Sequence, residues 1–81
     1  RHMEPFMIDI SPNETKQLPR SSHEGEEFIF VMEGALRVDY GKNSYIIEKG
    51  DSIYLDSVVD HFVTAHGNTP AKALAVVYIP V

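Results

Sequence analysis

Residues 27–33 read Glu-Phe-Ile-Phe-Val-Met-Glu, and a glycine ends the run. In an extended strand successive side chains point to opposite faces, so Ile29 and Val31 share one face and the two phenylalanines share the other. Both faces are therefore apolar, and a strand of this kind needs a cover on each side. The interior of the domain supplies one cover. We expect a second copy of the chain to supply the other, the alternative being flanking N- and C-terminal strands.

The rest of the chain repeats the same unit, a short apolar or β-branched run closed by a turn signal. This spacing of turns is typical of an antiparallel sandwich or barrel, and no stretch shows a helical period. We therefore predict an all-β domain without substantial helix. The expected strands are Phe6–Ile10, Thr15–Leu18, Glu27–Glu33, Ala35–Tyr40, Ser44–Glu48, Ser52–Leu55, His61–Ala65 and Lys72–Ile79.

Length and composition narrow the class of protein. The chain has 81 residues, a net charge of −5 and no cysteine. This length allows one domain with a small core, which oligomerisation commonly supplements. The acidic balance argues against direct contact with a nucleic-acid backbone, and no apolar run is long enough to span a membrane. The absence of cysteine suits the cytoplasm, where we expect the protein to act. Residues 1–3 resemble a cloning remnant, which leaves 4–81 as the domain.

Three residues are candidates for metal-binding chemistry: His23, Glu27 and His61. Two imidazoles and one carboxylate at one mouth of a small barrel would match the facial triad that leaves open positions on Fe(II), and Mn, Zn or Ni would also suit this set. The alternative is that both histidines are ordinary surface or core residues. Asp60 could orient the ring of His61, or it could be a plain turn aspartate. His66 lies in a turn sequence and is expected on the surface.

An apolar interior with a few converging polar groups is the usual site for a small molecule. We predict such a pocket beside the three candidate ligands, with one or two of its tyrosines able to face outward instead. Its predicted lining residues are Met7, Ile29, Val31, Tyr54, Val63 and Tyr78.

At these residues the chain resembles the cupin family. In the first cupin motif a glycine follows the glutamate by seven positions, as Gly34 follows Glu27, and a histidine precedes it, as His23 does. The second motif opens on a glycine and reaches a histidine, as Gly50 and His61 do. The resemblance implies a double-stranded β-helix, or jelly-roll, barrel over residues 4–79.

The departures from the two motifs bear on the metal site. Ser21 stands where the family has its first metal-binding histidine, so the resemblance implies at most three ligands. In the second motif Asp56, Val58 and Ala65 replace a proline, a glycine and an asparagine.

Three runs, at residues 3–6, 23–28 and 50–57, resemble the C-terminal cupin domains of xenobiotic-response-element-type helix-turn-helix regulators, and also small freestanding cupins. This implies a ligand-sensing, dimerising module, with DNA recognition carried out by another part of the regulator.

The alternative is a metal-dependent enzyme of the oxygenase, epoxidase or isomerase type. The reduced ligand set resembles that of the iron-dependent hydroxypropylphosphonate epoxidase, which uses two histidines and a glutamate. A third alternative is a metal-free barrel used for dimerisation. The sequence singles out no separate catalytic acid or base.

Overall fold

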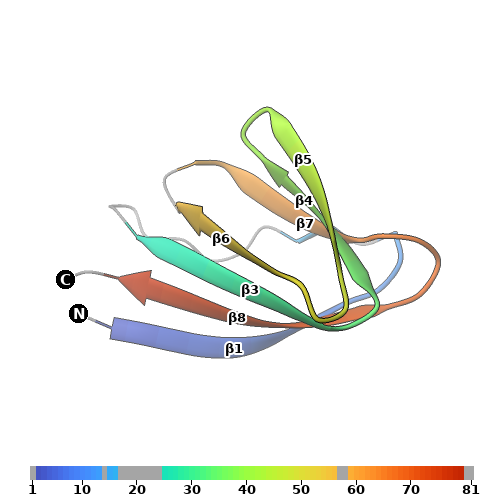
Figure 1. Cartoon of the computed structure of the whole chain (residues 1–81), viewed down its shortest axis with the longest axis horizontal. Coiled ribbons are helices and arrows are strands. Elements are labelled where there is room, and N and C mark those ends of the chain that lie inside the picture. Colours follow the sequence, from blue (N-terminus) through green and yellow to red (C-terminus); the bar gives the residue numbers. More distant parts are fainter. Residues whose placement is uncertain (1, 14, 17–24, 57–58, 80–81) are drawn as a thin grey trace.

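The computed structural model describes residues 2–13, 15–16, 25–56 and 59–79. The described residues form two four-stranded sheets in which every pairing is antiparallel, with strand orders β1-β8-β3-β6 and β2-β7-β4-β5 (Figure 1). This confirms the all-β jelly-roll barrel. The strands are β1 (His2–Ile10), β2 (Thr15–Lys16), β3 (Glu26–Glu33), β4 (Ala35–Tyr40), β5 (Asn43–Glu48), β6 (Ser52–Asp56), β7 (His61–Ala65) and β8 (Ala71–Ile79).

The core lies between the two sheets and follows the alternation of the strands. On β3, Ile29 and Val31 are fully buried while the residues between and beside them are exposed. Strand β8 contributes small inward side chains, which let the sheets approach closely. The core consists of Ile8, Ile10, Ile29, Val31, Leu36, Val38, Ile47, Leu55, Val63, Ala71, Ala73 and Ala75.

Strand β1 starts earlier than its apolar run indicates. It pairs with β8 along its whole length, from His2 opposite Ile79 to Ile10 opposite Ala71. Backbone hydrogen bonds to a long neighbour extend a strand beyond its hydrophobic residues. Pro5 is tolerated inside β1 because this strand lies at the edge of its sheet. No helix among the described residues is long and apolar enough to cross a membrane.

Gly34 connects β3 of one sheet to β4 of the other. Its φ angle is 74°, in the left-handed region that L side chains rarely adopt. A Cβ atom at this position would lie 2.6 Å from the carbonyl oxygen of Pro70. Both conditions require glycine, so Gly34 allows the chain to pass from one sheet to the other at this point.

Candidate functional site

The interior contains one buried polar pair among the described residues, formed by Glu27 and His61. Glu27 is the second residue of β3 and His61 the first of β7, so the two come from opposite sheets. Both side chains are fully shielded from solvent, and Nε2 of His61 lies 3.1 Å from Oε1 of Glu27. The structure thus brings together two of the three predicted ligands at the end of the barrel where β3 and β7 begin.

The other ring nitrogen of His61 decides the chemistry of the pair. Nδ1 lies 2.7 Å from the backbone carbonyl of Val59, which can only accept a hydrogen bond, so Nδ1 carries a proton. In a neutral ring Nε2 is then left with its lone pair facing Glu27. A short contact between that lone pair and a carboxylate oxygen requires a positive centre shared by both, either a proton or a metal ion.

The donor set fits a divalent metal ion. Two donors in neighbouring coordination positions, each about 2.1 Å from one ion, lie roughly 3 Å apart. The separation of 3.1 Å between Nε2 and Oε1 matches this spacing. The Val59 carbonyl orients the ring in the way that metal-binding histidines are usually oriented. Within the described part of the chain no third histidine or carboxylate completes a ligand group. His23, the remaining predicted ligand, lies outside the described residues.

A cleft of about 490 Å³ opens between β4 and β5 of one sheet and β6 of the other. Two of its lining residues are direct cross-strand neighbours of the polar pair, since Tyr40 pairs with His61 and Leu55 pairs with Glu27. The ring centroids of Tyr40 and His61 are 6.5 Å apart. The cleft is lined by Tyr40, Ser44, Tyr45, Ile46, Ile47, Ser52, Ile53, Tyr54 and Leu55.

Three of the predicted pocket residues point into the interior. Ile29, Val31 and Val63 have no exposed surface and pack in the core between the sheets. Their contact with a small molecule stays a prediction.

The other three predicted pocket residues lie on the outside of the barrel, which corrects the interior orientation expected for Met7 and agrees with the outward alternative that the sequence left open for the tyrosines. Met7 is 48% exposed and Tyr54 65% exposed, while Tyr78 is half-buried on the outer face of the same sheet. Tyr54 still borders the cleft from its rim. Each of the three shares its side of the strand with a charged residue, because Asp9, Asp56 and Lys72 alternate in step with them. Sharing a side of the strand with a charged residue therefore indicated, in the sequence itself, that these side chains face outward.

Asp60, for which the sequence also allowed a plain turn aspartate, is not the group that contacts Nδ1 of His61. The Val59 carbonyl takes that position at Nδ1, whereas Asp60 is exposed and its backbone carbonyl accepts a hydrogen bond from the Gly41 amide. Sequence reasoning also missed Tyr40, whose hydroxyl accepts a hydrogen bond of 3.1 Å from the Asp56 amide and so joins the two sheets beside the pair. Tyr40 alternates in step with Leu36 and Val38 along β4, and both of these are buried, so the sequence would have indicated that the Tyr40 ring points inward.

The profile of the cupin domain family matches residues 6–77. The chain belongs to the cupin family. Cupins often bind metals, although no particular metal is established for this chain.

Two curated relatives are similar to this cupin in sequence. An uncharacterised protein of Methanocaldococcus jannaschii is 30% identical over 71 residues, which cover 88% of the chain and 57% of that protein. The (S)-2-hydroxypropylphosphonic acid epoxidase of Streptomyces wedmorensis is 31% identical over 80 residues, covering 89% of the chain and 39% of the epoxidase. The cupin therefore spans between about two fifths and three fifths of the length of these relatives.

Solved structures share the fold. The cupin domain of an XRE-family transcriptional regulator from Enterobacter cloacae superimposes with a TM-score of 0.89 at 13% identity, over 98% of this chain and 83% of that one. An HTH_3-family transcriptional regulator from Vibrio cholerae gives 0.87 at 22% identity, over 98% of this chain and 44% of the regulator. Iron(II) HppE in complex with substrate gives 0.75 at 30% identity, over 91% of this chain and 44% of that one.

Proposed function

We propose that this cupin is a sensing module that binds a small organic molecule in the interior of the barrel, next to a divalent metal ion held by Glu27, His61 and His23. The buried Glu27–His61 pair carries this proposal. A carboxylate and an imidazole buried in an apolar barrel are strongly desolvated, and a shared cation offsets that penalty. Fe, Mn, Zn and Ni all accept this donor set.

The cleft beside Tyr40 supports the ligand-binding part of the proposal. It connects the outside of the barrel to the cross-strand neighbours of the polar pair, and its walls combine isoleucine and leucine side chains with tyrosine and serine hydroxyls. We propose a ligand with an apolar body that enters between β5 and β6 and a polar group that faces His61. The metal would attract that polar group as a Lewis acid.

The similarity to cupin domains of transcriptional regulators supports a role in sensing. We propose that the domain forms a homodimer in the cytoplasm, as part of a helix-turn-helix regulator or as a freestanding cupin. The chain itself would not contact nucleic acid, because its net charge is −5.

Metal binding to the purified, chelator-treated chain tests the proposal. We expect about one Mn²⁺ or Zn²⁺ per chain in isothermal titration calorimetry, and loss of this binding in His61→Ala and Glu27→Ala. His66→Ala is the matched control, since His66 is exposed on a turn. His23→Ala tests the third ligand. Equal binding by the wild-type chain and by both pair variants would contradict the proposal.

A second candidate function is metal-dependent oxidation, which the identity of 31% to the epoxidase favours. Under this alternative the same pair would hold iron, and the cleft would accept a phosphonate such as (S)-2-hydroxypropylphosphonic acid. Phosphorus NMR of that compound with the Fe(II)-loaded chain in air, with and without a reductant, distinguishes the two functions. A new phosphorus signal that His61→Ala abolishes supports an enzyme, whereas saturable binding without conversion supports a sensing module.

A further inference from the structure

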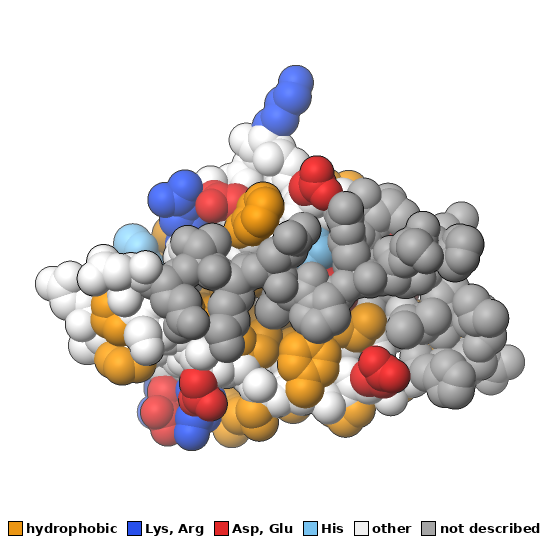
Figure 2. Space-filling model, turned by 180° about the vertical axis from the view of Figure 1, so that it is seen from behind, with side chains coloured by type: hydrophobic (Ala, Val, Ile, Leu, Met, Phe, Trp, Pro, Cys, Tyr) orange, Lys and Arg blue, Asp and Glu red, His pale blue; other side chains and the backbone are white. Residues whose placement is uncertain are grey.

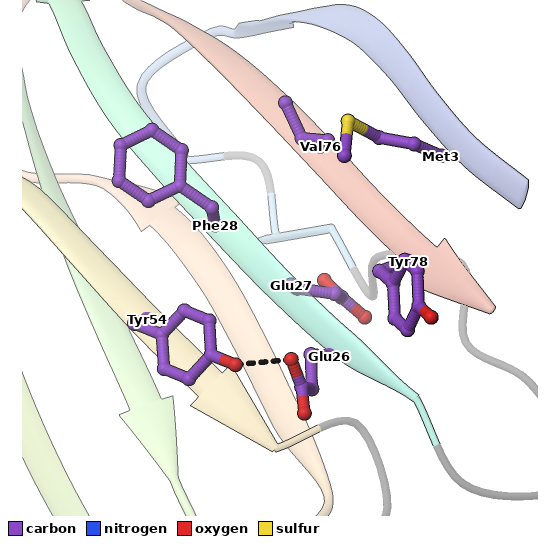
Figure 3. Close-up of a pocket in the computed structure, with 7 residues that line it drawn as sticks. All are labelled: Met3, Glu26, Glu27, Phe28, Tyr54, Val76 and Tyr78. Atoms are coloured by element: carbon purple, nitrogen blue, oxygen red, sulfur yellow. Dashed lines mark hydrogen bonds between the residues drawn. The ribbon is translucent and has the colours of Figure 1, made fainter. Parts of the chain in front are cut away.

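Two tyrosines hold the end of strand β6, one on each side of the strand. The hydroxyl of Tyr40, which lines the cleft, accepts a hydrogen bond of 3.1 Å from the amide of Asp56, the last residue of β6. The hydroxyl of Tyr54, two residues earlier, donates a hydrogen bond to Glu26 of β3 on the outer side (Figure 3). The first bond joins β6 to the opposite sheet, whereas the second joins it to its neighbour within the same sheet.

From the end of β6 a series of hydrogen bonds leads to the imidazole of His61. The Asp56 carbonyl accepts a hydrogen bond of 3.2 Å from the Val59 amide, and the Val59 carbonyl accepts the Nδ1 proton of His61 at 2.7 Å. Three hydrogen bonds thus connect the Tyr40 hydroxyl to the ring whose Nε2 faces Glu27. A carbonyl can orient an imidazole only where its own backbone is held in place, so each bond in this series supports the next.

The end of β4 reaches the same backbone at a second point. The amide of Gly41, directly after Tyr40, donates a hydrogen bond of 3.0 Å to the carbonyl of Asp60. Tyr40 is also the cross-strand neighbour of His61, and their rings lie 6.5 Å apart between centroids. Replacing Tyr40 with phenylalanine leaves the main-chain bond and the ring in place, so this change isolates what the hydroxyl contributes.

The position of the Tyr40 bond indicates more than a link between sheets. In the part of the chain that the structure describes, β6 is an edge strand, so amides along its free side need partners from outside their sheet. A bond that served only to close the barrel could lie anywhere along β6. This one lies at Asp56, the residue whose carbonyl begins the series that ends at His61.

We infer that Tyr40 is a positioning residue for His61. Its hydroxyl fixes the end of β6, and through Asp56 and Val59 it holds the imidazole with Nε2 directed at Glu27 before a metal ion binds. Loss of an outer hydrogen bond of this kind lowers metal affinity because the ring must then be ordered during binding. The inference rests on the metal site proposed above, and the orientation of the ring can be measured without metal.

Metal binding by Tyr40→Phe measures the effect on affinity. In isothermal titration calorimetry with Mn²⁺ or Zn²⁺ alone we expect the dissociation constant to rise about tenfold, the lower end of the usual range for an orienting partner, because Tyr40 acts through two intervening residues. Tyr54→Phe is the matched control, since it removes a hydroxyl and its hydrogen bond from the outer side of the same strand end. It should change the dissociation constant less than about threefold.

The control lies well away from the buried pair. Tyr54 is 65% exposed on the outer side of its sheet. In Figure 2 hydrophobic side chains gather along the lower part of the molecule, the side on which β1 and β8 of this sheet lie in Figure 1. Because no small molecule is added, the position of Tyr54 at the rim of the cleft does not enter the measurement.

The imidazole gives a readout that needs no metal. In the ¹⁵N-labelled, chelator-treated chain we expect a resolved NMR signal from the Nδ1 proton of His61, because the ring is buried and this proton is held by the Val59 carbonyl. In Tyr40→Phe this proton should exchange with water at least roughly tenfold faster, relative to the amide of Val63 in the same strand. General destabilisation of the barrel would speed both exchanges together.

A second pair of variants tests the same bond from its donor. Asp56→Pro removes the amide hydrogen that Tyr40 accepts, at the end of an edge strand where proline is tolerated, and Asp56→Ala keeps that amide. We expect Asp56→Pro to weaken metal binding about tenfold relative to Asp56→Ala. Adding Tyr40→Phe to Asp56→Pro should weaken it no further, because both changes remove one interaction.

The contrary outcomes are distinct. If the wild-type chain binds neither metal ion, the proposed function fails, and the exchange of the Nδ1 proton then decides the role of Tyr40 by itself. Unchanged affinity and unchanged relative exchange in Tyr40→Phe overturn the positioning role, even if the melting temperature falls, because Tyr40 would then only join the sheets. Equal effects of Tyr40→Phe and Tyr54→Phe also overturn it, since they would show that any loosening of β6 has the same result.

Discussion

The outer faces of the two sheets differ in chemistry although each sheet has four strands. On the β2-β7-β4-β5 sheet, Asp39 accepts hydrogen bonds from Arg37 and Ser44, and Phe62 and Ile46 are separate apolar residues around them. On the β1-β8-β3-β6 sheet the aromatic and methionine side chains are contiguous. Both sheets pack on the same core, so the core does not require the difference between their outer faces.

The buried pair links the two sheets, and its loss should have the largest effect on stability. Replacing Glu27 or His61 with alanine leaves the other side chain desolvated without its partner, and we expect the free energy of unfolding to fall by about 3–5 kcal/mol. Urea unfolding followed by circular dichroism measures this. Glu26→Ala and His66→Ala are matched controls, because both side chains are exposed, and each should lose less than about 1 kcal/mol. If Glu26→Ala and Glu27→Ala lowered the free energy of unfolding equally, a stabilising contact between Glu27 and His61 would be contradicted.

The crossing at Gly34 should have the next largest effect. Gly34→Ala combines a left-handed backbone with a clash against the Pro70 carbonyl, and we expect a loss of about 3 kcal/mol. Gly67 also has a positive φ, 91°, but its surroundings are open, so Gly67→Ala should lose only about 1–2 kcal/mol. Thermal melting of the two variants compares them directly. Similar melting temperatures would show that the contact with Pro70 has no effect.

On the outer face of the β1-β8-β3-β6 sheet, the contact between Tyr54 and Glu26 should be visible in the pH titration of the Tyr54 hydroxyl. The hydrogen bond to the Glu26 carboxylate raises the pKa of Tyr54 above its ordinary range. A raised pKa means that the contact stabilises the fold below about pH 10 and that this contribution is lost as the pH rises through the raised value. Tyrosinate absorbance, with Tyr54→Phe subtracted, follows the titration. Glu26→Gln should move the midpoint down, and an unchanged midpoint would contradict the assignment.

On the outer face of the β2-β7-β4-β5 sheet we expect the smallest effect on stability. The hydrogen bond from Ser44 and the charge of Arg37 lower the pKa of Asp39, although this group is exposed and screened by water. A lowered pKa contributes stability above the ordinary carboxyl range, near pH 4, and the contribution is lost as the pH falls through the lowered value. Asp39→Asn should therefore change the urea midpoint slightly at low salt and not at molar salt. A large change that persists in high salt would contradict the exposed placement.

The spacing of turn signals was enough to predict the all-β fold, and alternation was enough to place Glu27, Ile29 and Val31 on one face of their strand, which the structure shows to be the inward face. The same alternation could have corrected Met7, Tyr54 and Tyr78, since each shares its side of the strand with a charged residue. The apolar character of Met7 favours the interior, but its alternation in step with Asp9 places it on the outside. These are local properties, because the face that a side chain takes depends only on its neighbours along one strand.

Tertiary structure alone decided which strands face one another. Glu27 and His61 are 34 positions apart in the chain, and their contact of 3.1 Å depends on β3 and β7 beginning at the same end of opposite sheets. The orienting carbonyl of Val59 and the link from Tyr40 to the Asp56 amide also involve backbone groups, which no pattern of side chains records. The contiguous outer side chains of the β1-β8-β3-β6 sheet likewise come from the register between neighbouring strands, which is set by how the whole barrel closes.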